Sequence, residues 1–361
     1  MVDDPVPHLL AIASEVMALD DYVVLERPAG AVRFRGRLMA EPSHSYEALA
    51  ERARRFGYLP MLQRDDGRDS ITFLPHTPVA YRTRPRLALL LLVLTILSTL
   101  FVGASMTEPD LPSMIRHPLS GLPFSLALML TLGVHEMGHF LMARHYGVQV
   151  TLPYFIPMPF GPFGTMGAFI SMKSVPVNKR QLLHIGLAGP LAGLAVGLIV
   201  CLYGLSISPL SVMQPGTVYY REGNSILYLL LKYAIFGRWL PSGSLDVNLS
   251  PVGFAGWAGL LVTGLNLIPA AQLDGGHIAY ALFGRRARIV TFAIAGALLL
   301  LGVWWQGWIL WAAIILLLGW RPQVVLDEIT GLTRRDKLVA ALGLILFILL
   351  FVPLPLVIVG A

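Results

Sequence analysis

Residues 122–146 read LPFSLALMLTLGVHEMGHFLMARHY, an apolar segment interrupted by one polar cluster, HEMGH at 135–139. Histidines four positions apart lie on one face of an α-helix, close enough to bind a single Zn²⁺. His135 and His139 have this spacing, and the adjacent Glu136 is placed to take a proton from a water bound by the metal. The cluster therefore predicts two zinc ligands and a general base.

A second interpretation is that this short pattern arose by chance and that its histidines make ordinary contacts. The surrounding composition argues against it, because an ionisable side chain inside a membrane span costs free energy and is functional by default. Between residues 111 and 326 the acidic residues are restricted to Glu136, Glu222, Asp246 and Asp274. We therefore favour the zinc interpretation.

The composition is that of a membrane protein. The chain has 361 residues, of which 55% are hydrophobic and 13% charged, and its mean hydropathy is +0.67. Several apolar runs of about 18 or more residues predict a polytopic α-helical membrane protein. The single cysteine, Cys201, lies inside one of these runs. A disulfide within the chain and a cysteine-based metal site are both excluded.

The net charge of +6 belongs to the apolar part, since residues 1–86 contain twelve Arg and twelve Asp or Glu. This distribution favours a positive-inside topology signal. We expect no nucleic-acid partner, because neither a basic helix nor a basic patch interleaved with aromatic residues is present. The acidic start, residues 1–5, has no apolar run, so we expect neither a signal peptide nor a transit peptide.

Residues 1–80 are predicted to form a small soluble α+β domain. Alternating segments at 22–26 and 31–38 indicate two strands, a helix should end near residue 56, and two more strands are expected at 58–63 and 70–74. No catalytic constellation is found there, and its arginines are typical of a solvated surface. By analogy alone, we expect an accessory or gating role.

Residues 81–361 are predicted to form the membrane-embedded domain. Basic clusters flank the apolar segments on one side only, that of residues 1–80, which predicts about seven crossings with the N-terminal domain and the active site on the cytoplasmic side. The metal is expected within the bilayer, near its inner surface. We expect the membrane to be that of a prokaryotic cell. The predicted spans are 87–104, 121–146, 182–205, 252–272, 289–305, 306–320 and 338–358, with an outer connection at 206–248.

Residues 148–177 are rich in Pro and Gly yet apolar, and include VTLPYFIPMPFGPFGTMGAFISMKSVPV. They cannot form a straight helix, and irregular backbone at membrane depth is tolerated only inside protein or beside water. We predict a re-entrant loop with short strands, for example at 167–172. Its edge would either pair with an extended peptide or simply close the bundle.

The small residues of GLAGPLAG, 186–193, indicate close helix packing.

A third ligand is expected from NLIPAAQLDGGH, residues 266–277. Pro269 breaks the helix and the glycine pair lets the chain unwind, which would aim the carboxylate of Asp274 inward. A catalytic zinc needs three protein ligands and one open position, and His135, His139 and Asp274 supply that number. Alternatively, Asp274 pairs with one of the arginines that follow at 285–288.

Taken together, HEMGH on a membrane helix, GPLAG on a later one and NLIPAAQLDGGH about 130 residues after the first motif resemble the site-2 protease family of intramembrane zinc metalloproteases. The resemblance covers about residues 80–320. The N-terminal domain and the loop around PYFIPMPFGPFGTMGAFI are similar to the branch containing the chloroplast ethylene-dependent gravitropism-deficient and yellow-green proteins.

The resemblance implies one Zn²⁺ per chain, held by His135, His139 and Asp274, with Glu136 as general base. It implies that Asn266 helps to bind substrate or to stabilise the oxyanion. His277 stands where many members have Arg, and it either orients Asp274 or has no role. The implied substrates are transmembrane segments of other membrane proteins, cleaved within the lipid bilayer as in regulated intramembrane proteolysis.

Two other functions use the same residues. A metal or proton transporter would have the ligands form a transport site, but an internal repeat and a string of ionisable residues through the bilayer are both missing. A non-catalytic relative would only bind membrane partners, but Glu136 and all three ligands are present. We therefore expect a protease.

Overall fold

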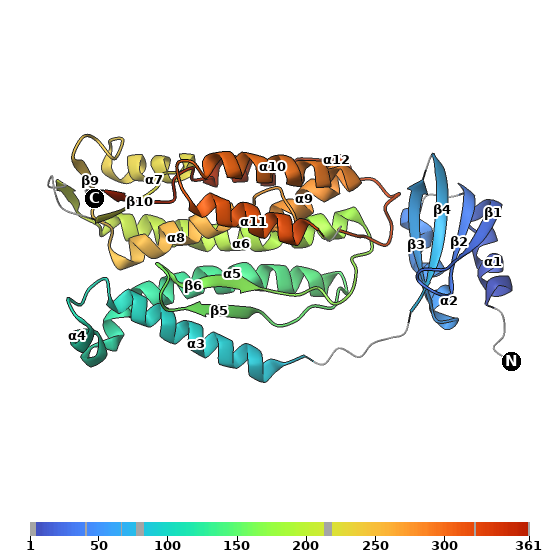
Figure 1. Cartoon of the computed structure of the whole chain (residues 1–361), viewed down its shortest axis with the longest axis horizontal. Helices are drawn as coiled ribbons and strands as arrows, with labels where there is room; N and C mark the ends of the chain where they lie inside the picture. The colour runs from blue at the N-terminus through green and yellow to red at the C-terminus, as the bar shows by residue number, and fades with distance from the viewer. Residues whose placement is uncertain are drawn as a thin grey trace.

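The computed structural model describes residues 5–39, 42–65, 67–76, 83–212, 219–320 and 323–359. A sheet domain lies at one end of its long axis and a larger helical body makes up the rest (Figure 1). The predicted domain boundary between residues 80 and 81 falls outside the described residues, so its position stays a prediction.

The N-terminal domain is α+β, as expected. Its sheet is antiparallel with the strand order β1-β2-β4-β3. Phe34, Ile71 and Phe73 form its core with residues of both helices, because alternate strand residues point to one face. The elements are α1 (Val6–Ser14), β1 (Met17–Leu25), β2 (Ala31–Leu38), α2 (Pro42–Arg55), β3 (Tyr58–Asp65) and β4 (Arg68–Pro75). Helix α1 was not predicted, and β1 begins five residues earlier than the expected Tyr22.

Three helices of the second body are long and apolar enough to cross a membrane: α3 (Pro85–Ala104), the helix containing α5 (Leu122–His145), and α6 (Lys179–Ser206). The other four predicted spans correspond to α8 (Pro251–Asn266), α10 (Ala287–Leu301), α11 (Gly307–Gly319) and α12 (Arg334–Leu350). These have 16, 15, 13 and 17 residues. The number of seven crossings therefore stays a prediction. The remaining helical segments are α4 (Leu111–Arg116), η1 (Pro118–Gly121), α7 (Ile226–Phe236), α9 (Asp274–Phe283) and η2 (Gly284–Arg286).

The end of the chain differs from the prediction of a helix over 338–358. Helix α12 stops at Leu350, and β10 (Leu356–Val359) pairs with β8 (Tyr219–Glu222). The reason is local: Pro353 and Pro355 lack the amide hydrogens that a helix needs, and they turn the chain into an extended segment.

The predicted re-entrant segment contains a hairpin. Strands β5 (Tyr154–Met158) and β6 (Gly164–Phe169) are antiparallel and lie between α3 and α5 (Figure 1). The expected strand at 167–172 was thus placed three residues too late. Ser98 of α3 donates a hydrogen bond to the carbonyl of Gly164 at 2.6 Å. The hairpin is therefore fastened to a long helix, as irregular backbone inside a membrane protein must be.

At the end of the helical body farthest from the sheet domain, a buried ion cluster joins three elements. The Lys232 ammonium of α7 is fully buried, 2.8 Å from a Glu222 carboxylate oxygen and 3.3 Å from one of Asp246. Asp246 belongs to β9 (Leu245–Val247), which pairs with β7 (Leu210–Val212). Tyr228 also donates to Glu222. The one lysine thus compensates two carboxylates taken out of water.

We expect Lys232→Met to destabilise the protein strongly, because it leaves two buried carboxylates uncompensated. Removing one partner of a buried ion pair costs about 3–5 kcal/mol. The measurement is the thermal unfolding midpoint of the purified protein in detergent. Lys337→Met is the control, since Lys337 is exposed at the start of α12. Equal midpoints for the two variants would contradict the expectation.

Candidate metal centre

Helix α5 carries the HEMGH cluster toward the interior of the helical body. His135, Glu136 and His139 are all buried, with exposed fractions of 3%, 5% and 6%. Nδ1 of His139 lies 2.7 Å from the carbonyl oxygen of Ile185 in α6 and donates to it. The proton is thereby fixed on Nδ1, which leaves Nε2 with a free lone pair for a metal.

Asp274 reaches the same place from the other side. Helix α8 ends at Asn266, an irregular turn follows, and α9 begins with Asp274 itself. Its Oδ2 is 3.2 Å from Nε2 of His139 and 3.3 Å from Nε2 of His135, and the two nitrogens are 3.2 Å apart. No arginine pairs with Asp274 in the part of the chain that the structure describes. The alternative of an interfacial ion pair is therefore not found.

The three distances fit one zinc ion. Zinc bonds to nitrogen and oxygen are about 2.0–2.2 Å long, so tetrahedral ligand atoms lie about 3.3 Å from one another. The three separations in the structure are close to this edge length, and no lysine or arginine lines the adjoining cavity among the described residues. His135, His139 and Asp274 thus form the group that the sequence singled out, and their role as ligands stays a prediction.

A cavity of about 370 Å³ adjoins this group, and Glu136 and Asn266 line it. Within the described residues the Glu136 carboxylate makes no hydrogen bond, so it is free to accept a proton from a molecule in the cavity. Nδ2 of Asn266 is 3.3 Å from Nε2 of His135. Both residues lie where the sequence placed them, and their catalytic roles stay predictions.

His277 is buried behind the group and lines the same cavity. The structure shows no hydrogen bond from His277 to Asp274 among the described residues, and Nδ1 of His277 has no partner there. Of the two roles considered for His277, hydrogen bonding to the Asp274 carboxylate is not observed.

Two glycines of α6, predicted from the sequence only to allow close helix packing, lie against the two imidazoles. A Cβ on Gly189 would lie 2.1 Å from Nε2 of His139, and one on Gly193 would lie 2.9 Å from Nδ1 of His135. Both imidazoles thus rest directly on the backbone of α6. The spacing of 189 and 193 equals that of 135 and 139, and this match was the signal that could have found them.

Comparison with known protein families identifies the family of this chain. Residues 123–304, half of the chain, match the model of Peptidase family M50. The chain belongs to family M50. The matched range includes both motifs of the metal group and the glycine face of α6. The resemblance to the site-2 proteases is therefore confirmed.

Relatives within family M50 support the expected branch as well. The chain is 32% identical to an Arabidopsis thaliana protein named "Probable zinc metalloprotease EGY2, chloroplastic", over 95% of this chain and 64% of that protein. It is 29% identical to the protein of the same name from Oryza sativa subsp. indica, over 78% of this chain and 54% of that protein. For Arabidopsis "Probable zinc metalloprotease EGY1, chloroplastic", the identity is 29% over 68% of this chain and 45% of that protein.

The chain thus spans less than two thirds of the length of these family M50 relatives. No solved structure matches it. The expectation of a prokaryotic cell membrane is wrong, because the relatives are plant proteins named chloroplastic and point to a chloroplast membrane.

We expect Gly189→Ala to lower zinc affinity about tenfold or more, the range seen when groups that orient ligands are removed. The new methyl group would occupy the space of the His139 imidazole and displace its Nε2. Zinc bound per chain after dialysis against a chelator is the measurement. Gly133→Ala is a matched control in α5, since a Cβ there meets no atom within 4 Å. Full zinc retention in Gly189→Ala would refute the expectation.

Proposed function

We propose that this chain is a zinc metalloprotease that hydrolyses peptide bonds within or next to the transmembrane segments of membrane proteins. The observation that carries the proposal is the group of three donor atoms at zinc spacing beside the free Glu136 carboxylate. Membership of family M50 and the names of the relatives support it. His135, His139 and Asp274 would hold the ion.

The residues around the cavity would have separate chemical roles. Bound zinc supplies a Lewis acid that makes a water more acidic and a carbonyl more electrophilic. Glu136 takes the proton of the attacking water and then gives it to the leaving amine, as a general base and acid. Asn266, beside His135, donates an amide hydrogen to the oxygen that becomes negative in the transition state.

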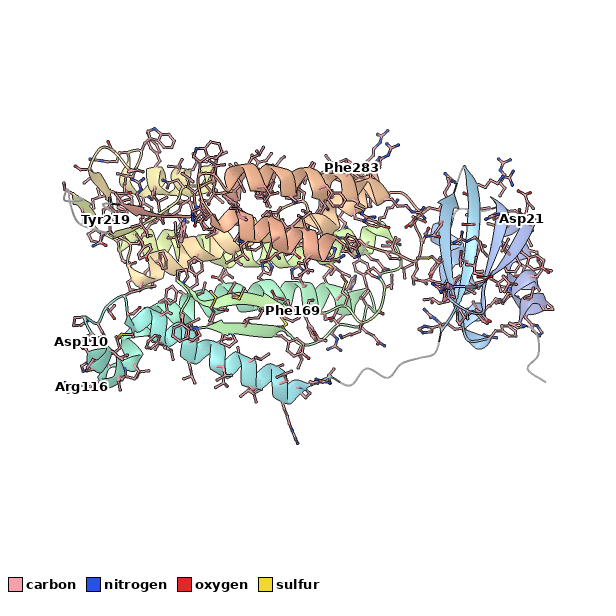
Figure 2. The ribbon with its side chains drawn as sticks, viewed as in Figure 1. Asp21, Asp110, Arg116, Phe169, Tyr219 and Phe283 are labelled. Carbon is pink, nitrogen blue, oxygen red and sulfur yellow. The ribbon has the colours of Figure 1, made fainter. Side chains whose placement is uncertain are left out.

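Strand β6 is the proposed binding site of the substrate. Ala168 and Phe169 at its end line the cavity of Glu136, and Figure 2 shows Phe169 on the hairpin between α3 and α5. Among the described strands β6 pairs only with β5, so its other edge is available for an extended peptide. A substrate helix must unwind to pair there, because a helix hides its peptide bonds in its own hydrogen bonds.

The setting is a lipid bilayer, crossed about seven times. Three long apolar helices support the bilayer setting, and the relatives' names lead us to propose a chloroplast membrane. The metal group lies in the half of α5 that ends at His145, toward the sheet domain (Figure 1). Water would then reach it from the side of that domain.

We expect Glu136→Gln to retain one zinc per chain and to lower cleavage of a membrane-embedded peptide by at least about 10²-fold, since it removes the proton acceptor. Asp274→Ala should lose the zinc as well. Zinc content and cleavage in proteoliposomes are measured together. Glu47→Gln, at an exposed position of α2, is the control. Undiminished cleavage by Glu136→Gln would remove the proposed base, and transport without proteolysis would favour a transporter.

We also expect helix-breaking residues to improve a substrate. A Pro in the centre of a reporter's transmembrane helix weakens the helix by about 3 kcal/mol relative to Ala, which favours the extended form. The ratio kcat/KM should rise severalfold over that of the Ala reporter. A Pro placed in the soluble flank is the control. Equal values for the central-Pro and Ala reporters would contradict binding as a strand.

A further inference from the structure

Residues 323–328, here called the clasp segment, lie between α11 and α12 and join the sheet domain to the helical body. The amide of Leu62 in β3 donates to the carbonyl of Leu326 at 2.7 Å, and the amide of Glu328 donates to the carbonyl of Leu62 at 3.0 Å. The clasp segment thus forms an isolated parallel bridge, between Asp327 and Leu62, at the open edge of the sheet.

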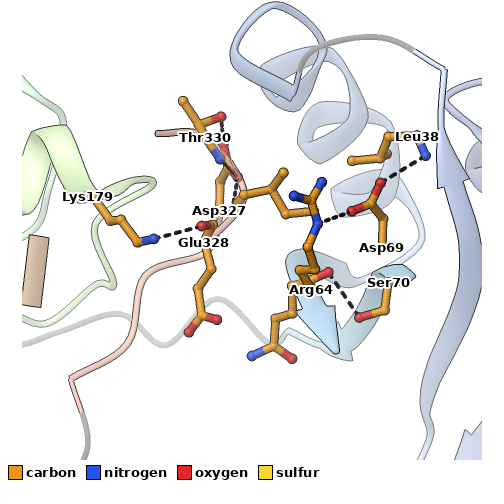
Figure 3. Close-up of polar contacts among 10 residues, drawn as sticks. Leu38, Arg64, Asp69, Ser70, Lys179, Asp327, Glu328 and Thr330 are labelled. Atoms are coloured by element: carbon orange, nitrogen blue, oxygen red, sulfur yellow. Dashed lines mark hydrogen bonds and ion pairs between the residues drawn. The ribbon is translucent and has the colours of Figure 1, made fainter. Parts of the chain in front are cut away.

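The opposite edge of the clasp segment is bound as well. The amides of Leu326 and Asp327 donate to the carbonyls of Pro176 and Val177, at 3.1 and 2.6 Å. These two residues connect the hairpin to α6. Lys179, the first residue of α6, donates to the carbonyl of Glu328 at 3.0 Å, and the Asp327 carboxylate accepts from Thr330 (Figure 3). The clasp segment is therefore held between the two parts of the molecule.

The side chain of Leu326 completes the core of the sheet domain. It is 6% exposed and belongs to the same apolar cluster as Phe34 and Phe73, with Val177 packed against it. The sheet domain therefore contacts the helical body through a core residue. Separating the two would expose Leu326 and an unpaired strand edge, both of which are unfavourable in water.

The clasp segment also bonds to both ends of the region around α9, the helix that begins with Asp274. At one end, Nε2 of Gln323 donates to the carbonyl of Ala271, whose φ of 53° puts it in the left-handed region. At the other end, the Glu328 carboxylate accepts from the hydroxyl of Tyr280 at 2.9 Å and pairs with Arg285 at 3.2 Å. Figure 2 shows Phe283, the last residue of α9, at the end of the body that faces the sheet domain.

Helix α9 depends on such outside contacts. It has 10 residues, and its N-cap, Leu273, makes no side-chain hydrogen bond. Helices this short are marginal by themselves, so packing and anchoring determine where they lie. The anchors at Ala271 and at Tyr280 bracket Asp274, and both come from the clasp segment.

We propose that the docked sheet domain positions Asp274 through the clasp segment, with Glu328 and Gln323 as positioning residues. A docked domain holds the clasp segment, the clasp segment holds α9, and α9 holds the carboxylate 3.2–3.3 Å from the two imidazoles. An undocked domain releases α9 and weakens the metal centre. This inference rests on the proposed metal ligands, and it gives the N-terminal domain control over the zinc.

The test uses the full-length zinc protein and no peptide substrate, so it is independent of what the enzyme cleaves. Leu326→Asp puts a charge into the apolar core of the sheet domain. Glu328→Ala removes the bonds to Tyr280 and Arg285 but keeps the backbone hydrogen bonds to Leu62. Glu328→Gln keeps an acceptor for Tyr280. Val24→Asp is the control, because Val24 is 54% exposed on β1. Zinc release to a chelator, the visible spectrum of the Co²⁺ form, and amide hydrogen exchange at Leu62 and Glu328 are measured.

We expect Leu326→Asp to lose exchange protection at Leu62 and to release zinc about fivefold faster or more, a typical coupling between sites. Glu328→Ala should release zinc equally fast with Leu62 still protected and the Co²⁺ spectrum altered. Glu328→Gln should recover part of the loss, and Val24→Asp should match wild type. Wild-type zinc release and spectrum in Glu328→Ala would overturn the role of Glu328. Undiminished protection of Leu62 in Leu326→Asp would overturn docking through Leu326.

Discussion

The structure depends on the approach of one partly buried carboxylate to two buried imidazoles. A carboxylate inside an apolar body is costly unless it is paired with a positive charge or a metal. The sequence around Asp274 reflects this cost. Helix α8 has to end at Asn266, and α9 has to start at Asp274, so that the side chain enters from the end of a helix. A continuous helix through this region could not present the same carboxylate in the same way.

Helix α6 also helps to place the two imidazoles. It accepts the proton of His139 at the carbonyl of Ile185, and at Gly189 and Gly193 it has no side chain where the rings lie. The backbone of α6 thus sets both the tautomer and the depth of the imidazoles. Helix α6 therefore contributes to the candidate site although it supplies none of the three candidate ligands.

Much of this could be predicted from local patterns. The HEMGH spacing places two side chains on one helix face whatever the fold, and the Pro269 break and the glycine pair singled out Asp274. Alternation of apolar and polar residues located three of the four strands of the N-terminal domain well. The predicted helix over 338–358 was wrong because the hydropathy of the segment was given more weight than Pro353 and Pro355. Helix α1 was missed although its buried residues Leu9, Ile12 and Ala13 have helical spacing. The clasp segment had no local signal at all, since Leu326 and Val325 look like ordinary loop residues until the sheet edge that receives them is known.

The proposed protease would need two things that lipid does not offer, namely water and an unpaired strand edge. The hairpin offers such an edge on β6, and the end of β6 lines the cavity of Glu136. The facing backbone groups of β5 and β6 pair with each other, and Ser98 donates a hydrogen bond to the carbonyl of Gly164, so part of the cost of non-helical chain is met within the protein. The free edge of β6 then ends at the cavity of Glu136, where an unwound peptide would bring its carbonyl beside the metal group. Binding to that edge and unwinding of the proposed substrate would therefore be one event, because the hydrogen bonds that the peptide loses as a helix would be regained along the strand.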